Sequence, residues 1–123
     1  MEPCCPIQSA LGPIGKKWSI NIIRDLFMGK KRFKDFLISN PTISTKMLST
    51  RLKELEKDKI IEKKVVSTNP IIIEYVLTTK GRSLNKILYE IALFSINEGS
   101  PDMNKKVNKE KTIADLKQCL HIR

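Results

Sequence analysis

The chain has 123 residues, of which 41% are hydrophobic and 29% are charged, a composition typical of one folded domain with an apolar core. Its formal net charge of +10 indicates a polyanionic partner, with nucleic acid the first choice and an anionic membrane surface the second. No stretch approaches about 20 apolar residues, and the N-terminus has no basic region followed by an apolar run. We therefore expect a cytoplasmic protein without a transmembrane span or signal peptide.

The first 40 residues predict three short helices. The first begins at Pro6, where proline is tolerated, and ends at Gly15. The second, within KWSINIIRDLFMG, is apolar on most sides, which is typical of a central helix. The third covers residues 32–39 and ends before Pro41. Three short helices in so few residues predict a compact helical bundle.

Residues 44–58 predict an amphipathic helix with a cationic outer face. Ser44 or Thr45 can cap its first turn. Three leucines, from Leu48 to Leu55, recur at i, i+4 and i+7 and predict a buried stripe. The other face carries polar and basic residues: Lys46, Ser49, Thr50, Lys53 and Lys57.

The pattern then changes from helical to extended. The segments IIEKKVVST and IIIEYVLTT are rich in β-branched residues, and Asn69-Pro70 between them is a turn signal. They predict a β-hairpin that carries Lys63 and Lys64 on its first strand.

A long helix is predicted over residues 80–97, with Thr79 as its cap. It has two apolar stripes, so one can pack on the domain while the other needs a further partner such as a second subunit. The first stripe is Leu84, Ile87, Leu88, Ile91 and Phe94, and the second is Tyr89, Leu93 and Ile96. Gly99-Ser100-Pro101 interrupts the chain, and the basic extension over residues 102–123 predicts a further helix in preference to a basic arm.

This order of elements predicts a winged helix-turn-helix, a mainly α fold with a β-hairpin wing. A short helix, a turn through Pro41-Thr42-Ile43 and a helix with small polar residues at its start form the helix-turn-helix, and the hairpin is the wing. The DNA major groove, about 12 Å wide, admits one α-helix, whose N-terminal residues meet base edges. We expect the following residues there: Ser44, Thr45, Lys46, Ser49, Thr50 and Lys53.

A second set of lysines is expected to neutralise phosphates, which contributes affinity but no sequence reading. These residues are Lys30, Lys31, Lys34, Lys63 and Lys64. The competing interpretation is that the lysines only keep an amphipathic surface soluble. The preceding helix, the turn, the hairpin and the net charge together favour double-stranded DNA as the partner.

A series of short motifs, in fixed order, extends over residues 5–96. They are Cys5-Pro6-Ile7, Ile14-Gly15, Lys17-Trp18, Arg32-Phe33, Phe36-Leu37, Ile43-Ser44, Met47-Leu48, Arg51-Leu52, Glu54-Leu55-Glu56, Glu74-Tyr75, Leu77-Thr78 and Gly81-Arg82-Ser83-Leu84. In this order they resemble the HxlR-type branch of the MarR-like winged-helix transcription regulators. The resemblance implies a homodimer joined through its first and last helices that binds an inverted-repeat operator as repressor or activator.

The resemblance also sets the expected domains and one departure. Residues 1–101 are expected to form the winged-helix domain, and residues 102–123 are an extension outside the match. The family usually has glycine after the acidic end of the reading helix, where a positive φ is favourable, but here Asp58 is followed by Lys59. We expect a local difference at the end of that helix.

The three cysteines, an odd number, provide no disulfide framework. The resemblance marks Cys5 as a possible sensor of oxidants or electrophiles, and a helix that opens at Pro6 would favour its thiolate. The competing interpretation is a small apolar side chain packed in a subunit interface. A further alternative is a metal-responsive regulator that binds zinc or a soft metal through Cys4, Cys5, Cys119 and His121.

Enzymatic and membrane functions are not favoured. The single histidine, His121, is near the C-terminus, and the carboxylates stand mostly on exposed helix faces rather than in a cleft. Residues 103–123 contain no aromatic anchor for a membrane surface. We expect neither catalysis nor a bound cofactor.

Overall fold

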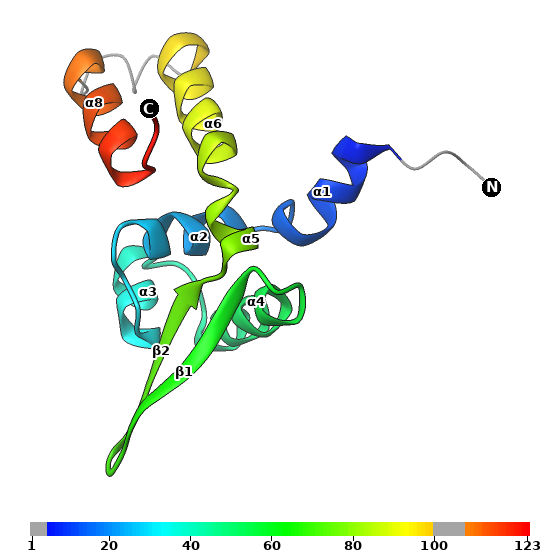
Figure 1. Ribbon diagram of the computed structural model, residues 1–123, viewed down its shortest axis with the longest axis vertical. Coiled ribbons are helices and arrows are strands. Elements are labelled where there is room, and N and C mark those ends of the chain that lie inside the picture. Colours follow the sequence, from blue (N-terminus) through cyan, green and yellow to red (C-terminus); the bar gives the residue numbers. More distant parts are fainter. Residues whose placement is uncertain (1–4, 100–107) are drawn as a thin grey trace. The chain divides into compact units, whose positions relative to one another are not determined.

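The computed structural model describes residues 5–99 and 108–123 (Figure 1). The described residues fall into two compact units that divide between Arg82 and Ser83. The first unit contains α1 (Pro6–Ile14), α2 (Ser19–Phe27), α3 (Phe33–Ser39), α4 (Thr45–Lys57), β1 (Ile61–Thr68), β2 (Ile71–Leu77) and α5 (Thr79–Arg82). The second contains α6 (Asn85–Glu98) and α8 (Lys109–Cys119). The predicted mainly α fold with a hairpin wing is confirmed.

The core of the first unit lies where α2, α3 and α4 meet the base of the hairpin. The predicted leucine stripe of α4 is buried there, as are apolar residues of the neighbouring elements. The side chains at its centre are Ile22, Ile23, Phe36, Leu48, Leu52, Leu55, Ile60 and Ile61. Since each fully buried aliphatic side chain contributes about 1.5–3 kcal/mol, this stripe holds α4 against the bundle and leaves its other face in solvent.

The hairpin is antiparallel and is attached to the helical bundle at its base. Lys63 lies opposite Tyr75, and a β-bulge interrupts the register between Val65 and Ser67. The Tyr75 backbone N–H donates to the Lys31 carbonyl (2.8 Å), and its ring packs edge-on against Phe36 with 6.2 Å between centroids. These contacts fix the base of the wing, while its tip extends away from the helices (Figure 1).

Lys59, which stands where glycine was expected, lies at the end of α4. This residue has a φ of +62°, in the left-handed region that favours glycine. The Lys59 N–H donates to the Glu56 carbonyl (3.0 Å) and the Ile60 N–H to the Leu55 carbonyl (2.9 Å), which together form a Schellman motif. The Thr78 hydroxyl donates to the Lys59 carbonyl (2.6 Å). Lys59 is therefore held in the left-handed conformation that glycine adopts most readily at a helix end.

The prediction of one helix over residues 80–97 was wrong. It is divided into α5 and α6, with Ser83 and Leu84 between them. The cap is Thr78, not the predicted Thr79, because the Thr78 hydroxyl oxygen accepts the Gly81 N–H (3.0 Å). Gly81, inside α5, is buried against the Ile60 carbonyl, so this short helix packs against the base of the hairpin.

In the second unit, α6 packs with α8, which lies in the segment where a tail helix was predicted. The Asn85 amide donates to the Leu120 carbonyl (2.9 Å). Asn108 caps the start of α8 by accepting the Lys111 N–H (3.1 Å), and His121, with a φ of +53°, ends it. The predicted boundary between residues 101 and 102 stays a prediction.

Candidate nucleic-acid interface

The outward face of α4 places the predicted reading residues on one side of the helix. Lys46, Thr50 and Lys53, together with Lys57 one turn further on, form an exposed stripe at helical spacing. Ser44 and Thr45 are exposed at the N-terminal end of this stripe, while Ser49 beside it is half-buried. A helix that presents this stripe has its free donors and acceptors where a groove would meet them.

Two of the predicted hydroxyl groups are partly engaged by the helix itself. The Ser44 oxygen accepts the Met47 N–H (3.0 Å), which caps α4, so its proton is left for donation outward. The Thr50 hydroxyl donates to the Lys46 carbonyl (2.9 Å), so its oxygen is left as an acceptor. The Thr50 hydroxyl is therefore left as an acceptor only, whereas the Ser44 hydroxyl keeps its proton and one lone pair for a ligand.

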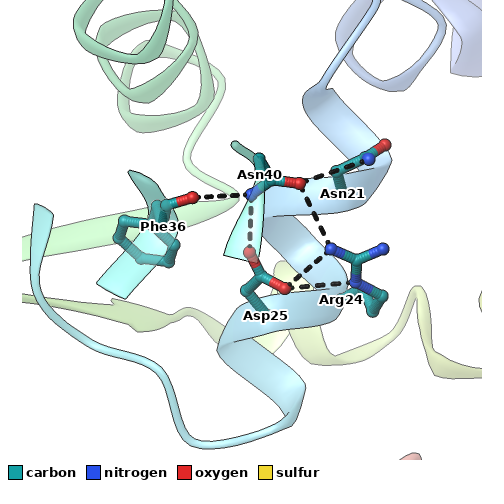
Figure 2. Close-up of polar contacts among 5 residues, drawn as sticks. All are labelled: Asn21, Arg24, Asp25, Phe36 and Asn40. Atoms are coloured by element: carbon teal, nitrogen blue, oxygen red, sulfur yellow. Dashed lines mark hydrogen bonds and ion pairs between the residues drawn. The ribbon is translucent and has the colours of Figure 1, made fainter. Parts of the chain in front are cut away.

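A buried polar cluster orients the turn that leads into α4 (Figure 2). Asn40 ends α3 and is 3% exposed. Its amide donates to Asp25 Oδ2 (2.9 Å) on α2 and to the Phe36 carbonyl (2.8 Å) on α3. Its backbone carbonyl accepts the Ile43 N–H (3.0 Å) across the turn. One side chain thus joins α2, α3 and the turn of the helix-turn-helix.

The same cluster compensates a buried charge. Asp25 is 1% exposed, and Arg24 donates to its Oδ1 from Nε (3.1 Å) and from a terminal nitrogen (2.9 Å). The same terminal nitrogen lies 3.3 Å from the side-chain oxygen Oδ1 of Asn40, and the Asn21 side-chain amide nitrogen lies 3.4 Å from that oxygen. Removing any inner member would leave a buried polar group unpaired, so the cluster holds the helix-turn-helix angle firmly.

A second set of contacts joins α4 to the loop between α1 and α2. Arg51 Nε donates to the Lys17 carbonyl (2.8 Å), and its terminal nitrogen lies 3.1 Å from the Glu54 carboxylate. Lys16 Nζ is 3.3 Å from the same carboxylate. Sequence patterns marked Arg51 and Glu54 only as motif matches, because neither partner is near them in the chain.

The predicted phosphate-binding lysines lie around α3 and along β1. Lys31 and Lys34 are exposed and Lys30 is half-buried. Asp35 is among them: its carboxylate accepts the Arg32 N–H (3.1 Å), and this hydrogen bond is the main reason that its pKa is lowered. The Lys31 N–H and the nearby positive charges add to this effect, whereas desolvation opposes it. The surface at the start of α3 is therefore basic around one ionised carboxylate.

Lys63 and Lys64 are both exposed on β1, but neighbouring residues of a strand point to opposite faces. Lys63 lies opposite Tyr75, on the face that packs against Phe36, whereas Lys64 lies opposite Glu74. Burial, with a smaller contribution from Glu56, raises the pKa of Tyr75, so its hydroxyl stays neutral near pH 7. The two lysine side chains therefore leave the strand on opposite faces of the wing.

The thiols were predicted as sensor or metal ligands. Cys5 occupies the N-cap position of α1 in the first unit, and its exposed side chain makes no capping hydrogen bond. Cys119 is an exposed residue at the end of α8 in the second unit, and Cys4 lies outside the described residues. Within residues 5–99 and 108–123, no group of three or more His, Cys, Asp or Glu side chains could hold a metal ion. In the same residues, no helix is both long and apolar enough to cross a membrane.

The profile of the HxlR-like helix-turn-helix family matches residues 13–102. The chain belongs to this family. It is 42% identical over 88 residues to the HTH-type transcriptional regulator YodB of Bacillus subtilis. This match covers 72% of this chain and 79% of YodB.

Solved structures agree in fold with these relatives. The reduced form of YodB from B. subtilis superposes with a TM-score of 0.69 at 39% identity, covering 80% of this chain and 98% of that one. The redox regulator HypR in its oxidised form superposes with a TM-score of 0.70 at 36% identity, covering 74% of this chain and 94% of that one. The chain is therefore a helix-turn-helix transcription regulator, a class of DNA-binding proteins that are generally not enzymes.

Proposed function

We propose that this protein is a cytoplasmic, homodimeric regulator that binds an inverted-repeat operator with α4 in the major groove. The observation that carries the proposal is the exposed stripe of α4, which begins at the helix-turn-helix and is backed by a buried leucine stripe. A helix fixed on one side and hydrogen-bonding on the other suits groove reading. The lysines around α3 and on β1 would contact phosphates, and the wing would add backbone or minor-groove contacts.

Unpartnered apolar residues on two helices support the homodimer. On α1, Ile7 and Leu11 are 73% and 53% exposed at i, i+4 spacing. On α6, Ile87, Ile91 and Phe94 form an exposed stripe, while Leu88, Tyr89 and Ile96 are buried. Such stripes on helices are typical of subunit contacts. We therefore assign α1 and α6 to the subunit interface. α6 lies within the helix predicted over residues 80–97, one apolar stripe of which was expected to need a second subunit.

Selection of bound duplexes from a random pool tests the DNA proposal, and an inverted repeat is the expected product. Lys46→Ala or Thr50→Ala should then weaken operator binding by roughly 5- to 150-fold, because a base contact is worth about 1–3 kcal/mol. Lys117→Ala, an exposed lysine on α8, is the matched control and should bind normally. Unchanged affinity for both α4 variants would exclude this docking of α4.

We further propose that Cys5 makes the regulator responsive to oxidants or electrophiles. Its exposed side chain at the start of α1 and the description of HypR as a redox regulator support this role. A route to DNA exists within the first unit: α1 leads into the Lys16–Lys17 loop, and Arg51 and Glu54 join that loop to α4. Displacement of α1 would thus bear directly on the reading helix.

Treatment with a mild oxidant, and separately with a quinone as electrophile, tests the sensor. DNA affinity should change in the parent protein and in Cys119→Ser but not in Cys5→Ser. In Arg51→Ala, mass spectrometry should show that Cys5 reacts with the oxidant or the quinone as it does in the parent protein. The resulting change in DNA affinity should be smaller than in the parent. An identical DNA response in the parent and in Cys5→Ser would remove the sensing role.

A further inference from the structure

The tip of the wing is apolar in a strongly basic chain. Residues 65–73 read VVSTNPIII and contain no charged side chain, although 23 of the 123 residues are lysine or arginine. Val65, Val66 and Ile71 are 58%, 51% and 70% exposed. Lys63 and Lys64 precede this segment directly, so the charge stops where the tip begins.

This exposed apolar tip carries a risk of association between chains, and no contact among the residues that the structure describes requires it to be apolar. Exposed strand edges rich in β-branched residues promote edge-to-edge association, and proteins usually protect such edges with lysine, proline or bulges. Here a bulge between Val65 and Ser67 and a turn at Asn69-Pro70 interrupt the edges. These devices limit association with other strands, but they leave Val66 and Ile71 facing solvent.

We infer that the wing tip is an apolar wedge that inserts Val66 and Ile71 into the minor groove beside the site read by α4; this inference rests on the proposed function. Phosphates offer nothing to aliphatic side chains, whereas sugar edges and base faces in the minor groove are apolar. Aliphatic side chains inserted between base steps partly unstack them and kink the duplex. Val66 follows the two lysines on β1, and Ile71 begins β2 across the turn, so the wedge lies directly beyond the basic part of the hairpin.

The reach of the hairpin fits this placement. Thr68, the last residue of β1, lies four residues beyond Lys64, which corresponds to about 13 Å along a strand. The minor groove is about 7.5 Å deep. With Lys64 at a phosphate on the rim, the tip extends far enough to meet the floor of the groove. The base of the wing is held by Tyr75, so insertion need not displace α4.

Two properties follow from a wedge without charge. The wing should favour flexible pyrimidine–purine steps, which are easily unstacked, at a fixed distance from each half-site. Its contribution should be insensitive to salt, because counterion release depends on charged contacts. The lysines at its base should behave in the opposite way.

The test uses the full-length protein and a duplex selected by it. The variant is Val66→Thr/Ile71→Thr, which keeps β-branched side chains but makes them polar, and Met28→Gln is the control for an exposed apolar residue elsewhere. Affinity is measured at several salt concentrations, bending by energy transfer between labelled duplex ends, and folding by circular dichroism.

The wedge predicts that the double threonine variant binds about tenfold more weakly and bends the duplex less, with the slope of affinity against salt unchanged. Lys64→Ala should lower that slope by about one and leave the bend in place. If the double variant binds and bends the duplex as the parent protein does, the inference is overturned, while the proposal that α4 binds the operator is unaffected. Normal bending with a loss of higher-order complexes would also overturn it and assign the tip to contacts between copies. Failure of the parent protein to bind any duplex would instead refute the proposed function.

Discussion

Asn40→Ala should destabilise the protein by about 3 kcal/mol. The side chain is buried, and it donates to the Asp25 carboxylate (2.9 Å) and the Phe36 carbonyl (2.8 Å). A hydrogen bond to a charged group is worth about 1.5–3 kcal/mol and a neutral one about 0.5–1.5 kcal/mol. Alanine removes both and leaves a carboxylate that is 1% exposed with Arg24 as its remaining side-chain partner. The ratio of folded to unfolded protein should fall roughly a hundredfold.

Urea denaturation at one fixed protein concentration measures this loss, since dimerisation would couple stability to concentration. Asn21→Ala is the control, because its amide reaches only the edge of the cluster at 3.4 Å and its loss should cost less than about 0.5 kcal/mol. A double-mutant cycle of Asp25→Ala with Asn40→Ala should give a coupling of about 2 kcal/mol. A midpoint for Asn40→Ala equal to that of the parent, or a cycle with no coupling, would refute this account of the helix-turn-helix angle.

Three further changes test the local structure by thermal or urea denaturation. Gly81→Ala should cost about 2 kcal/mol or more, because its Cβ would collide with the Ile60 carbonyl and lie 2.9 Å from Leu77 Cδ2; a neutral result would mean that this contact is loose. Lys59→Gly should stabilise by about 0.5–1 kcal/mol, since a lysine at a φ of +62° is strained, and Lys57→Gly should instead destabilise. Asp35→Asn should be slightly less stable at pH 7. The folded-state pKa of Asp35 is below its ordinary value of 3.8, so its stabilising effect exists above that value and is lost as pH falls through the folded-state pKa. The gap between parent and Asp35→Asn should therefore close in acid, and a gap that widens there would contradict the assignment.

The local elements of this protein could be predicted from residue spacing alone. The leucines of α4 recur every three or four residues, Ser44 precedes them, and two β-branched segments flank Asn69-Pro70, so each element is encoded within a few residues. The unusual lysine at position 59, where glycine is typical, could be identified from the sequence for the same reason, because a helix end requires a particular φ at one position. The order of these elements led to the winged helix-turn-helix and its family.

The contacts that position the site depend on residues far apart in the chain. Asp25 and Asn40 are 15 residues apart, and Arg51 reaches the Lys17 carbonyl across 34. No periodic pattern relates such pairs, because their distance is set by how α2, α3 and α4 pack. The close approach of Gly81 to the Ile60 carbonyl likewise depends on how α5 packs against the base of the hairpin.

Apart from the division of α5 from α6, the amino-acid sequence by itself therefore determined which segments are helix or strand, and which face of α4 is polar, since both depend on neighbours in the chain. The tertiary structure decided what holds that face in place: a buried carboxylate with its amide and guanidinium partners, and an arginine fixed to a distant loop. It also showed that Lys63 and Lys64 serve opposite faces of the wing and that the wing tip is left apolar and exposed. Burial is a property of the packed chain, so only packing could decide which face of the wing lies against Phe36 and which apolar residues stay exposed.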